Sequence, residues 1–119
     1  MAALTPVPAH GEPGARGRLR IADRVYARIA ARAAREALDE AWQGRAVRGG
    51  PPRVSAGGPT APSAPITVRV AVDLPFPADL AALARTVRDR IGADVRALTG
   101  TRVAEVVVVV ERLVTEAPG

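Results

Sequence analysis

The sequence predicts a small α+β domain in two layers, with two helices packed on one face of a small sheet, in the order helix, strand, helix, strand. Residues 18–42 and 78–100 carry apolar side chains at helical spacing. Residues 66–74 alternate apolar and polar side chains, as a strand with one covered face does. Residues 99–113 contain five consecutive valines, which is typical of a second strand.

The chain has 119 residues, which is enough for one small domain. We expect that domain to cover residues 18–114, between a disordered head (1–17) and a short tail (115–119). Residues 43–65 are rich in glycine, proline and serine and show no periodicity, so we expect a flexible linker inside the domain. This segment carries three arginines and no acid, whereas residues 66–119 carry seven of each. The net charge of +5 therefore lies mainly in the expected linker.

The first helix is predicted by an apolar stripe. Ile21, Val25, Ile29 and Ala33 recur every four residues, as on one face of an amphipathic helix. Asp23 is expected in or just before the first turn, where a carboxylate suits the free backbone N–H groups.

A second stripe on this helix is basic, and it consists of Arg24, Arg28, Arg32 and Arg35. Glu36 and Asp39 lie four residues after Arg32 and Arg35, so i,i+4 ion pairs are expected to compensate part of the charge. The stripe fits a site for an acidic partner, a polyanion or anionic headgroups. It equally fits the polar flank of an amphipathic helix in a chain that has no lysine, and the composition favours this second interpretation.

The strand over residues 66–74 should present Ile66, Val68, Val70 and Val72 to the core. Pro75 follows Leu74 and is expected to end the strand, because proline cannot donate to a sheet ladder.

The helix over residues 78–100 has the most continuous apolar stripe, which runs from Leu80 to Leu98. Asp79 is expected in the first turn, and Gly100 lies just past the end, where glycine is favoured. A strand, a helix and a strand in this order form a crossover unit, so the two flanking strands should be parallel.

The valine-rich strand raises the question of what covers its second face. We expect Val106, Val108 and Val110 to face the helices, in register with the valines of the preceding strand. Val107 and Val109 then point to the opposite face. They are core if the first helix packs over them, and they are a contact surface if both helices cover the other face. The two-layer arrangement favours the contact surface.

Taken together, three segments resemble the bacterial alkaline-shock, or envelope stress response, protein family. They read GRLRIADRVYARIAARAARE, VRVAVDLPFPADLAALARTVRDRI and LTGTRVAEVVVVVERL, and they lie within residues 17–42 and 66–113. The family often has an additional strand after the first helix, but residues 43–65 are too rich in proline to predict one here. Outward positions of the last strand are commonly polar in the family, whereas this chain has Val107 and Val109.

The resemblance implies a non-enzymatic cytoplasmic module that holds a partner and serves cell-envelope homeostasis. The implied partner is another protein, such as a small membrane-anchored one, and self-association is the alternative. The candidate partner-binding residues are Val107, Val109, Arg24, Arg28, Arg32 and Arg35.

Several kinds of chemistry are disfavoured by the residues themselves. His10 is the single histidine and lies in the expected head, and the chain has no cysteine, so a histidine-assisted nucleophile is not predicted. The acids are dispersed singly among arginines, which does not favour a metal site. We therefore expect no enzymatic activity and no cofactor or metal.

A small basic nucleic-acid-binding module is the alternative function, because the pI of about 11.3 is high. The near absence of aromatic residues and the balanced charge of residues 66–119 speak against it. No apolar run long enough for a signal peptide or a membrane span is found, so we expect no direct membrane insertion.

Overall fold

A computed structural model describes the backbone of residues 13–57, 61 and 64–115, and their side chains from residue 23 onward. The elements in chain order are α1 (Pro13–Trp42), β1 (Arg53–Gly57), β2 (Ile66–Pro75), α2 (Leu80–Thr99) and β3 (Val103–Val114). The strands form one mixed sheet with β2 in the centre. β1 pairs with β2 antiparallel, and β3 pairs with β2 parallel, as the crossover argument predicts.

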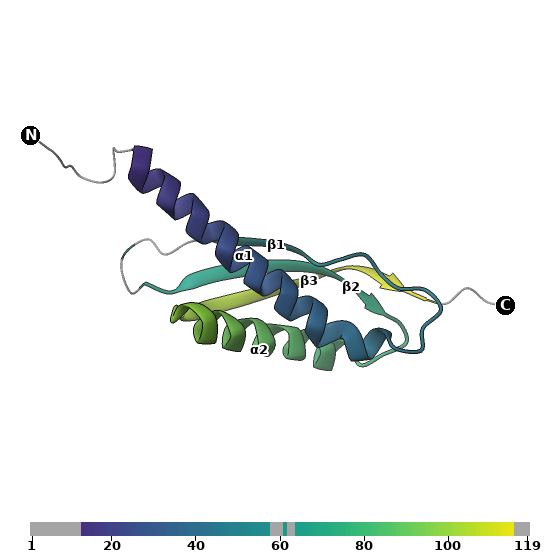
Figure 1. The fold of residues 1–119 in the computed structure, drawn as a ribbon. Coiled ribbons are helices and arrows are strands. Elements are labelled where there is room, and N and C mark those ends of the chain that lie inside the picture. The colour runs from purple at the N-terminus through teal and green to yellow at the C-terminus, as the bar shows by residue number, and fades with distance from the viewer. Residues whose placement is uncertain (1–12, 58–60, 62–63, 116–119) are drawn as a thin grey trace, which may run out of the picture.

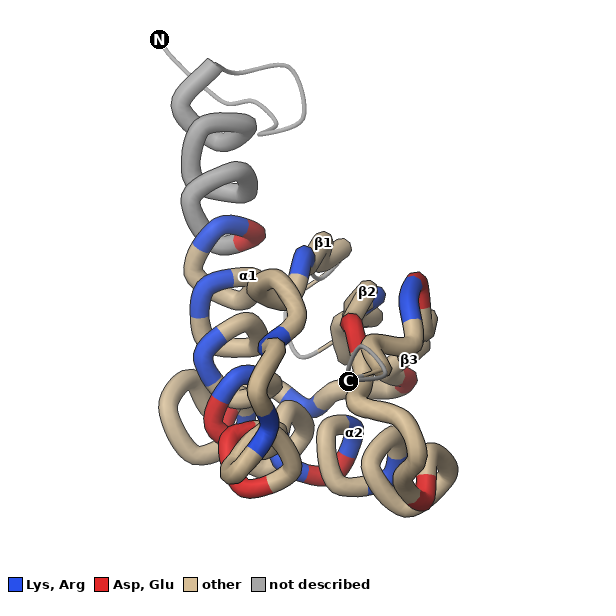
Figure 2. Tube along the Cα trace, turned by 90° about the vertical axis from the view of Figure 1, so that its right-hand side faces the viewer, with Lys and Arg blue, Asp and Glu red and all other residues tan. Residues whose placement is uncertain are grey.

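Both helices cover the same face of the sheet (Figures 1 and 2). α1 packs on β1 and β2, α2 packs on β3, and the two helices pack on each other. The predicted two-layer α+β fold is therefore confirmed, and one face of the sheet has no covering layer among the described residues.

The core lies between the helices and the covered face. Every second residue of β2 contributes to it, and Val68, Val70 and Leu74 are completely buried. The helices supply Ala30, Ala33 and Ala34 from α1, and Val87, Ile91 and Val95 from α2. The small alanines of α1 allow the helix to approach the sheet closely, which suits a core of this size.

The beginning of α1 differs from the prediction. The helix starts at Pro13 and not at residue 18, so residues 13–17 are helical where the sequence predicts a disordered head. A proline in the first helical position fits its fixed φ angle and missing N–H. Asp23 consequently lies inside the helix and is no part of its first turn. The remainder of the expected head, residues 1–12, lies outside the described residues.

The expected linker contains a strand, so the predicted element order is wrong at this point. β1 occupies Arg53–Gly57, and Val54 and Ala56 pack against the core while their neighbours are exposed. The prolines that argue against a strand, Pro51 and Pro52, precede β1 and do not interrupt its ladder. A strand of this length at the edge of a sheet has only two side chains that point to the core, and two positions are too few to show an alternation of apolar and polar residues in the sequence.

The ends of α2 are fixed by the residues that the sequence singles out. Asp79 is the N-cap, because its side chain accepts a hydrogen bond from the Ala82 N–H at 3.0 Å. Gly100 is the C-cap, with φ of 75°, and its N–H donates to the Arg96 carbonyl at 2.8 Å. β3 starts shortly afterwards, at Val103, so the cap sets the direction in which the chain returns to the sheet.

Candidate interaction surface

The valine run of β3 divides between the two faces of the sheet. Val106 and Val108 pair with Val68 and Val70 and pack against the core, as predicted. Val110 pairs with a core residue of β2 as well, yet it is 40% exposed. The C-terminal end of β3 extends past the N-terminal end of α2 (Figure 1). The exposure of Val110 thus differs from the expectation that it faces the helices.

Val107 and Val109 lie on the uncovered face. They pair with Arg69 and Ala71 of β2, outside the core cluster, and α1 packs on the opposite side of the sheet. Both valines are half-buried by their neighbours on the same face. The interpretation in which the first helix covers them is therefore wrong. We call this surface the open face, and its residues are Arg53, Ser55, Thr67, Arg69, Ala71, Glu105, Val107, Val109 and Glu111.

Charged side chains lie beside the apolar residues of the open face, which are Ala71, Val107 and Val109. Arg53 of β1 forms an ion pair with Glu111 of β3, which crosses the sheet close to Ala71. Arg69 and Glu105 are exposed, and the structure gives neither an ion pair among the described residues. The face therefore combines an apolar strip, formed by Val107 and Val109 on the edge strand β3 and Ala71 on β2, with two arginines and two glutamates beside it.

The four arginines of the predicted basic stripe do not meet the open face. Arg24, Arg28, Arg32 and Arg35 are exposed on α1, in the layer on the other side of the sheet (Figure 2). The six residues proposed from the sequence as one partner-binding set thus belong to two separate surfaces.

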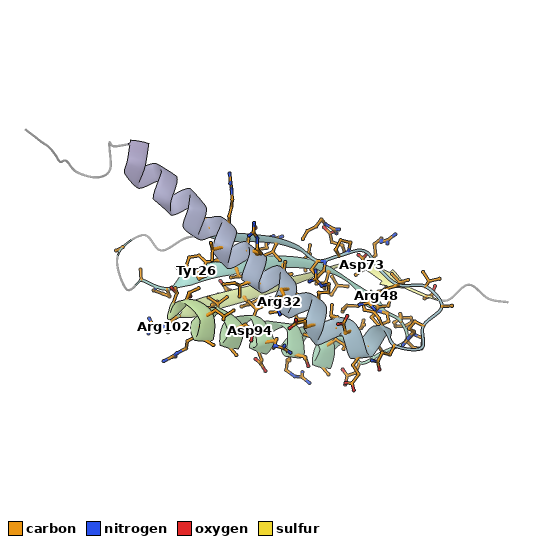
Figure 3. The ribbon with its side chains drawn as sticks, viewed as in Figure 1. Tyr26, Arg32, Arg48, Asp73, Asp94 and Arg102 are labelled. Atoms are coloured by element: carbon orange, nitrogen blue, oxygen red, sulfur yellow. The ribbon has the colours of Figure 1, made fainter. Side chains whose placement is uncertain are left out.

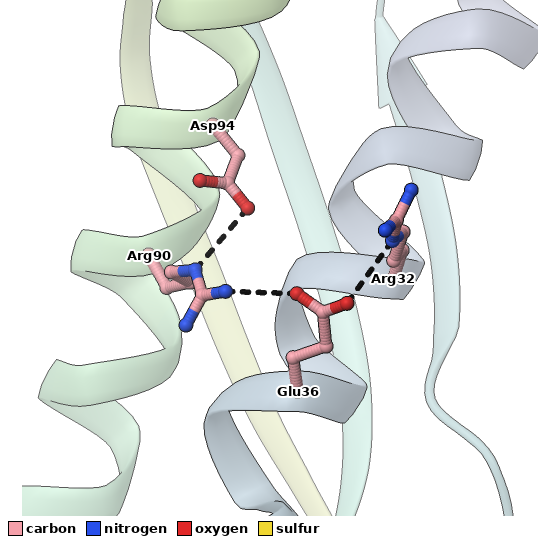
Figure 4. Close-up of polar contacts among 4 residues, drawn as sticks. All are labelled: Arg32, Glu36, Arg90 and Asp94. Atoms are coloured by element: carbon pink, nitrogen blue, oxygen red, sulfur yellow. Dashed lines mark hydrogen bonds and ion pairs between the residues drawn. The ribbon is translucent and has the colours of Figure 1, made fainter.

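One arginine of the stripe, Arg32, belongs to a network of ion pairs that joins the two helices through Glu36 and Arg90. Glu36 of α1 accepts hydrogen bonds from Arg32 at 3.0 Å and from Arg90 of α2 at 2.8 Å (Figure 4). Arg90 also donates to Asp94 at 3.2 Å. Of the two expected pairs on α1, the one between Arg32 and Glu36 is present. The other is absent, because Asp39 accepts from Arg48 instead of Arg35.

The basic charge of residues 43–65 is tied to the domain. Arg45 donates to the Pro77 carbonyl at 2.8 Å, Arg48 pairs with Asp39, and Arg53 pairs with Glu111. The expected linker is therefore bonded to the domain at each of these three arginines. The charge lies on the folded surface, and each arginine has an oxygen acceptor.

Asp73 joins three parts of the fold, although the alternation of residues 66–74 marks it only as one of the polar positions of that strand. It is 5% exposed, and its Oδ2 accepts from the Gly50 N–H at 2.9 Å and from Arg112 of β3 at 3.2 Å. Burial alone would raise the pKa of Asp73, but the Gly50 hydrogen bond, the Arg112 hydrogen bond and charge, and the Arg53 charge together lower it. The carboxylate is thus held ionised at the point where the segment before β1 meets β2 and β3.

A pocket of about 240 Å³ lies beside Asp73, between α1 and the segment that leads into β1. Its lining comes mainly from Arg35, Leu38, Trp42, Arg48, Gly49 and Asp73. Arg48 and Asp73 both lie near the end of the sheet where α1 ends (Figure 3). The bonds of the Asp73 Oδ2 to Gly50 and Arg112 hold backbone and strands in place, whereas its buried Oδ1 has no hydrogen-bond partner among the described residues. Gly49 is the sequence signal for this close approach, because a Cβ atom there would lie 2.6 Å from Cβ of Asp73.

Comparison with protein-family models, with curated proteins and with solved structures finds no match. Among the described residues, no helix has both the length and the apolar character needed to cross a membrane. The same residues contain no group of three or more acidic or histidine side chains placed to hold a metal ion.

Proposed function

We propose that this chain is a non-enzymatic interaction module of the envelope-stress type, which works in the cytoplasm and binds a protein partner through the open face of its sheet. The observation that carries the proposal is the position of Val107 and Val109, which lie on a sheet face that neither helix of the described residues covers. Interfaces between proteins commonly combine apolar residues with charged residues around them, and the open face has both kinds. The envelope-stress context, and a membrane-anchored partner, rest on the sequence resemblance.

The open face supports a protein partner better than a nucleic acid. Sheets that bind single-stranded RNA stack bases on aromatic side chains. Here the three aromatic residues lie elsewhere: Tyr26 and Trp42 on α1, and Phe76 after β2. The arginines on the face are balanced by glutamates, which lowers the electrostatic attraction for phosphates.

The proposal is tested by affinity capture, in which the full chain is immobilised and exposed to an extract of the cells whose genome encodes it. The chain with Val107→Asp and Val109→Asp together is compared with the wild type and with Ala97→Asp, which adds a charge at an exposed position of α2. We expect at least one protein to be retained by the wild type and by the Ala97→Asp control, and to be lost with the double variant, because charge at the centre of an interface opposes its desolvation. Retention of the same proteins by all three would contradict the proposal.

The nucleic-acid alternative is tested by retention on heparin and RNA at about 150 mM salt. Tight retention that survives the double valine substitution and falls with Arg24→Ala and Arg28→Ala would favour that alternative. These two arginines are exposed and have no ion pair among the described residues.

A further inference from the structure

The outer edge of β3 is a second surface suited to binding. Within the described part of the chain, β3 pairs only with β2. The backbone N–H and C=O groups on its other edge therefore have no partner strand. The register shifts near each end of β3, next to Thr67 and Asp73 of β2, and between these points residues 105–110 pair regularly. An unpaired, regular edge of this length is a template for adding another strand.

A shallow groove of about 510 Å³ runs beside this edge, between α2 and the first half of β3. Its lining consists of Arg88, Asp89 and Gly92 from α2 and Val103, Ala104, Glu105 and Val106 from β3. The space beside Gly92 is empty, because a Cβ atom added there would meet no heavy atom within 4 Å. The groove is therefore open at this position of α2. Val103 and Val106 pack against the core and make the floor apolar.

The charges around the groove are unsatisfied. Asp89 and Glu105 are exposed carboxylates without an ion pair in the described residues, and Arg88 is the one cation of the lining. The two carboxylates outnumber the single arginine, so a basic side chain on an occupant gains a partner here.

The position of α2 decides between two kinds of occupant. α2 packs on β3 itself, the outermost strand on this side. If β3 paired with β3 of a second copy, the strands would lie about 4.8 Å apart. The α2 helices beneath them need about 8–10 Å between their axes. A second copy would therefore collide at this edge, whereas an extended segment with no helix beneath it fits.

We propose that the outer edge of β3 binds an extended peptide segment, which adds to the sheet as a fourth strand. The segment has alternating β-branched residues, which point into the groove beside Gly92, and a basic residue within reach of Asp89 or Glu105. Main-chain hydrogen bonds supply affinity and the groove selects side chains, as in other cases of strand addition. This inference does not rest on the proposed function, because it concerns the backbone edge of β3 and the groove on its helix side, whereas the proposed function concerns the side chains of Val107 and Val109 on the open face.

The chain itself provides a suitable probe, since β2 is a strand that already pairs with β3. A synthetic peptide of residues 65–73, PITVRVAVD, has the alternation and carries Arg69 as its basic residue. It is titrated into the full-length protein while backbone amide resonances are recorded. We expect shifts at residues 105–110 and at Gly92, and slower hydrogen exchange of the amides on the outer edge. A scrambled peptide and one with proline in place of the central valine, which lacks that N–H donor, serve as peptide controls.

Gly92→Leu is the informative protein variant. The new side chain fills the groove, and it replaces glycine in a helix interior by a better helix former, so the fold is expected to persist. Binding of the PITVRVAVD peptide should weaken by at least about tenfold, which corresponds to about 1.4 kcal/mol. Ala93→Leu is the matched control, because the next residue of the same helix is exposed and lies outside the groove lining. It should bind the peptide as the wild type does.

The proposal is overturned by any of three results: no peptide binding at millimolar concentration, equal binding of the scrambled peptide, or equal binding by Gly92→Leu. Shifts confined to Val107, Val109 and their neighbours on β2 would place the peptide on the open face and would also overturn it. The Gly92→Leu variant keeps both valines of the open face, and the double valine variant keeps every residue of the groove lining, so comparison of the two variants distinguishes the two proposals.

Discussion

Gly49 provides the most direct test of how the segment before β1 packs against the domain. A methyl group added at Gly49 would lie 2.6 Å from Cβ of Asp73 and 2.9 Å from Cζ2 of Trp42. Neither atom moves away easily, because the Asp73 Cβ is fixed by the backbone of β2, and Trp42 is only 6% exposed. Overpacking of this kind costs about 1–3 kcal/mol. We therefore expect Gly49→Ala to lower Tm by about 4–8 °C for each kcal/mol lost in a domain of this size.

Gly50→Ala is the matched control for this prediction. A Cβ at Gly50 would meet only Oδ2 of Asp73, at 3.6 Å, which is an ordinary contact, and the N–H that bonds Asp73 is retained. Its stability should stay within about 0.5 kcal/mol of the wild type. Urea unfolding and thermal melts followed by circular dichroism measure both variants. If Gly49→Ala were as stable as Gly50→Ala, the segment would not be packed on Asp73 and Trp42, and the expected flexible linker would be the better description.

Three further predictions concern the polar contacts. Because the pKa of Asp73 is lowered in the folded state, its contribution to stability is complete above about pH 4 and is lost as the pH falls through the folded-state pKa. In urea unfolding across this pH range, the free energy of unfolding of Asp73→Asn should therefore fall less steeply with decreasing pH than that of the wild type. An equal slope for the two proteins would contradict this reasoning. Tyr26→Phe removes a 2.9 Å hydrogen bond to the Thr101 hydroxyl and should cost about 0.5–1.5 kcal/mol, and little further loss should follow when Thr101→Val is added. Arg90→Ala breaks the exposed ion pair with Glu36 and should lower the free energy of unfolding by less than about 1 kcal/mol, and by less still at high salt. A loss of stability that salt does not change would show that packing, and not charge, is lost.

The two-layer fold was predictable because its main elements carry strong periodic signals. Burial alternates along β2 from Ile66 to Val72 as the sequence does, and the apolar stripe of α2 ends at a glycine with positive φ. β1 was not predictable in the same way, because Val54 and Ala56 are its only inward side chains. Its stability comes from pairing with β2, which no local pattern reveals.

The candidate surface was only partly predictable from the sequence. The alternation of β3 placed Val107 and Val109 on the face opposite the core, but it did not separate them from the arginines of α1, which lie in the other layer. The role of Asp73 depends on Gly50 and Arg112, which are distant in sequence and meet only in the folded chain. The groove beside Gly92 likewise results from the packing of α2 on β3, and a glycine within a helix does not by itself reveal it.

The central claim is that the face carrying Val107 and Val109 lies outside the core and is free to bind. Thermal unfolding followed by circular dichroism tests it most directly, with Val107→Asp and Val109→Asp combined in one chain and Val108→Asp in another. Val108 packs against the core, so its replacement by a carboxylate should cost several kcal/mol and unfold the domain or lower its Tm sharply. The double variant should retain the wild-type spectrum and melt close to the wild-type temperature. If the double variant unfolded as completely as Val108→Asp, the open face would be part of the core, and the proposed docking surface would be wrong.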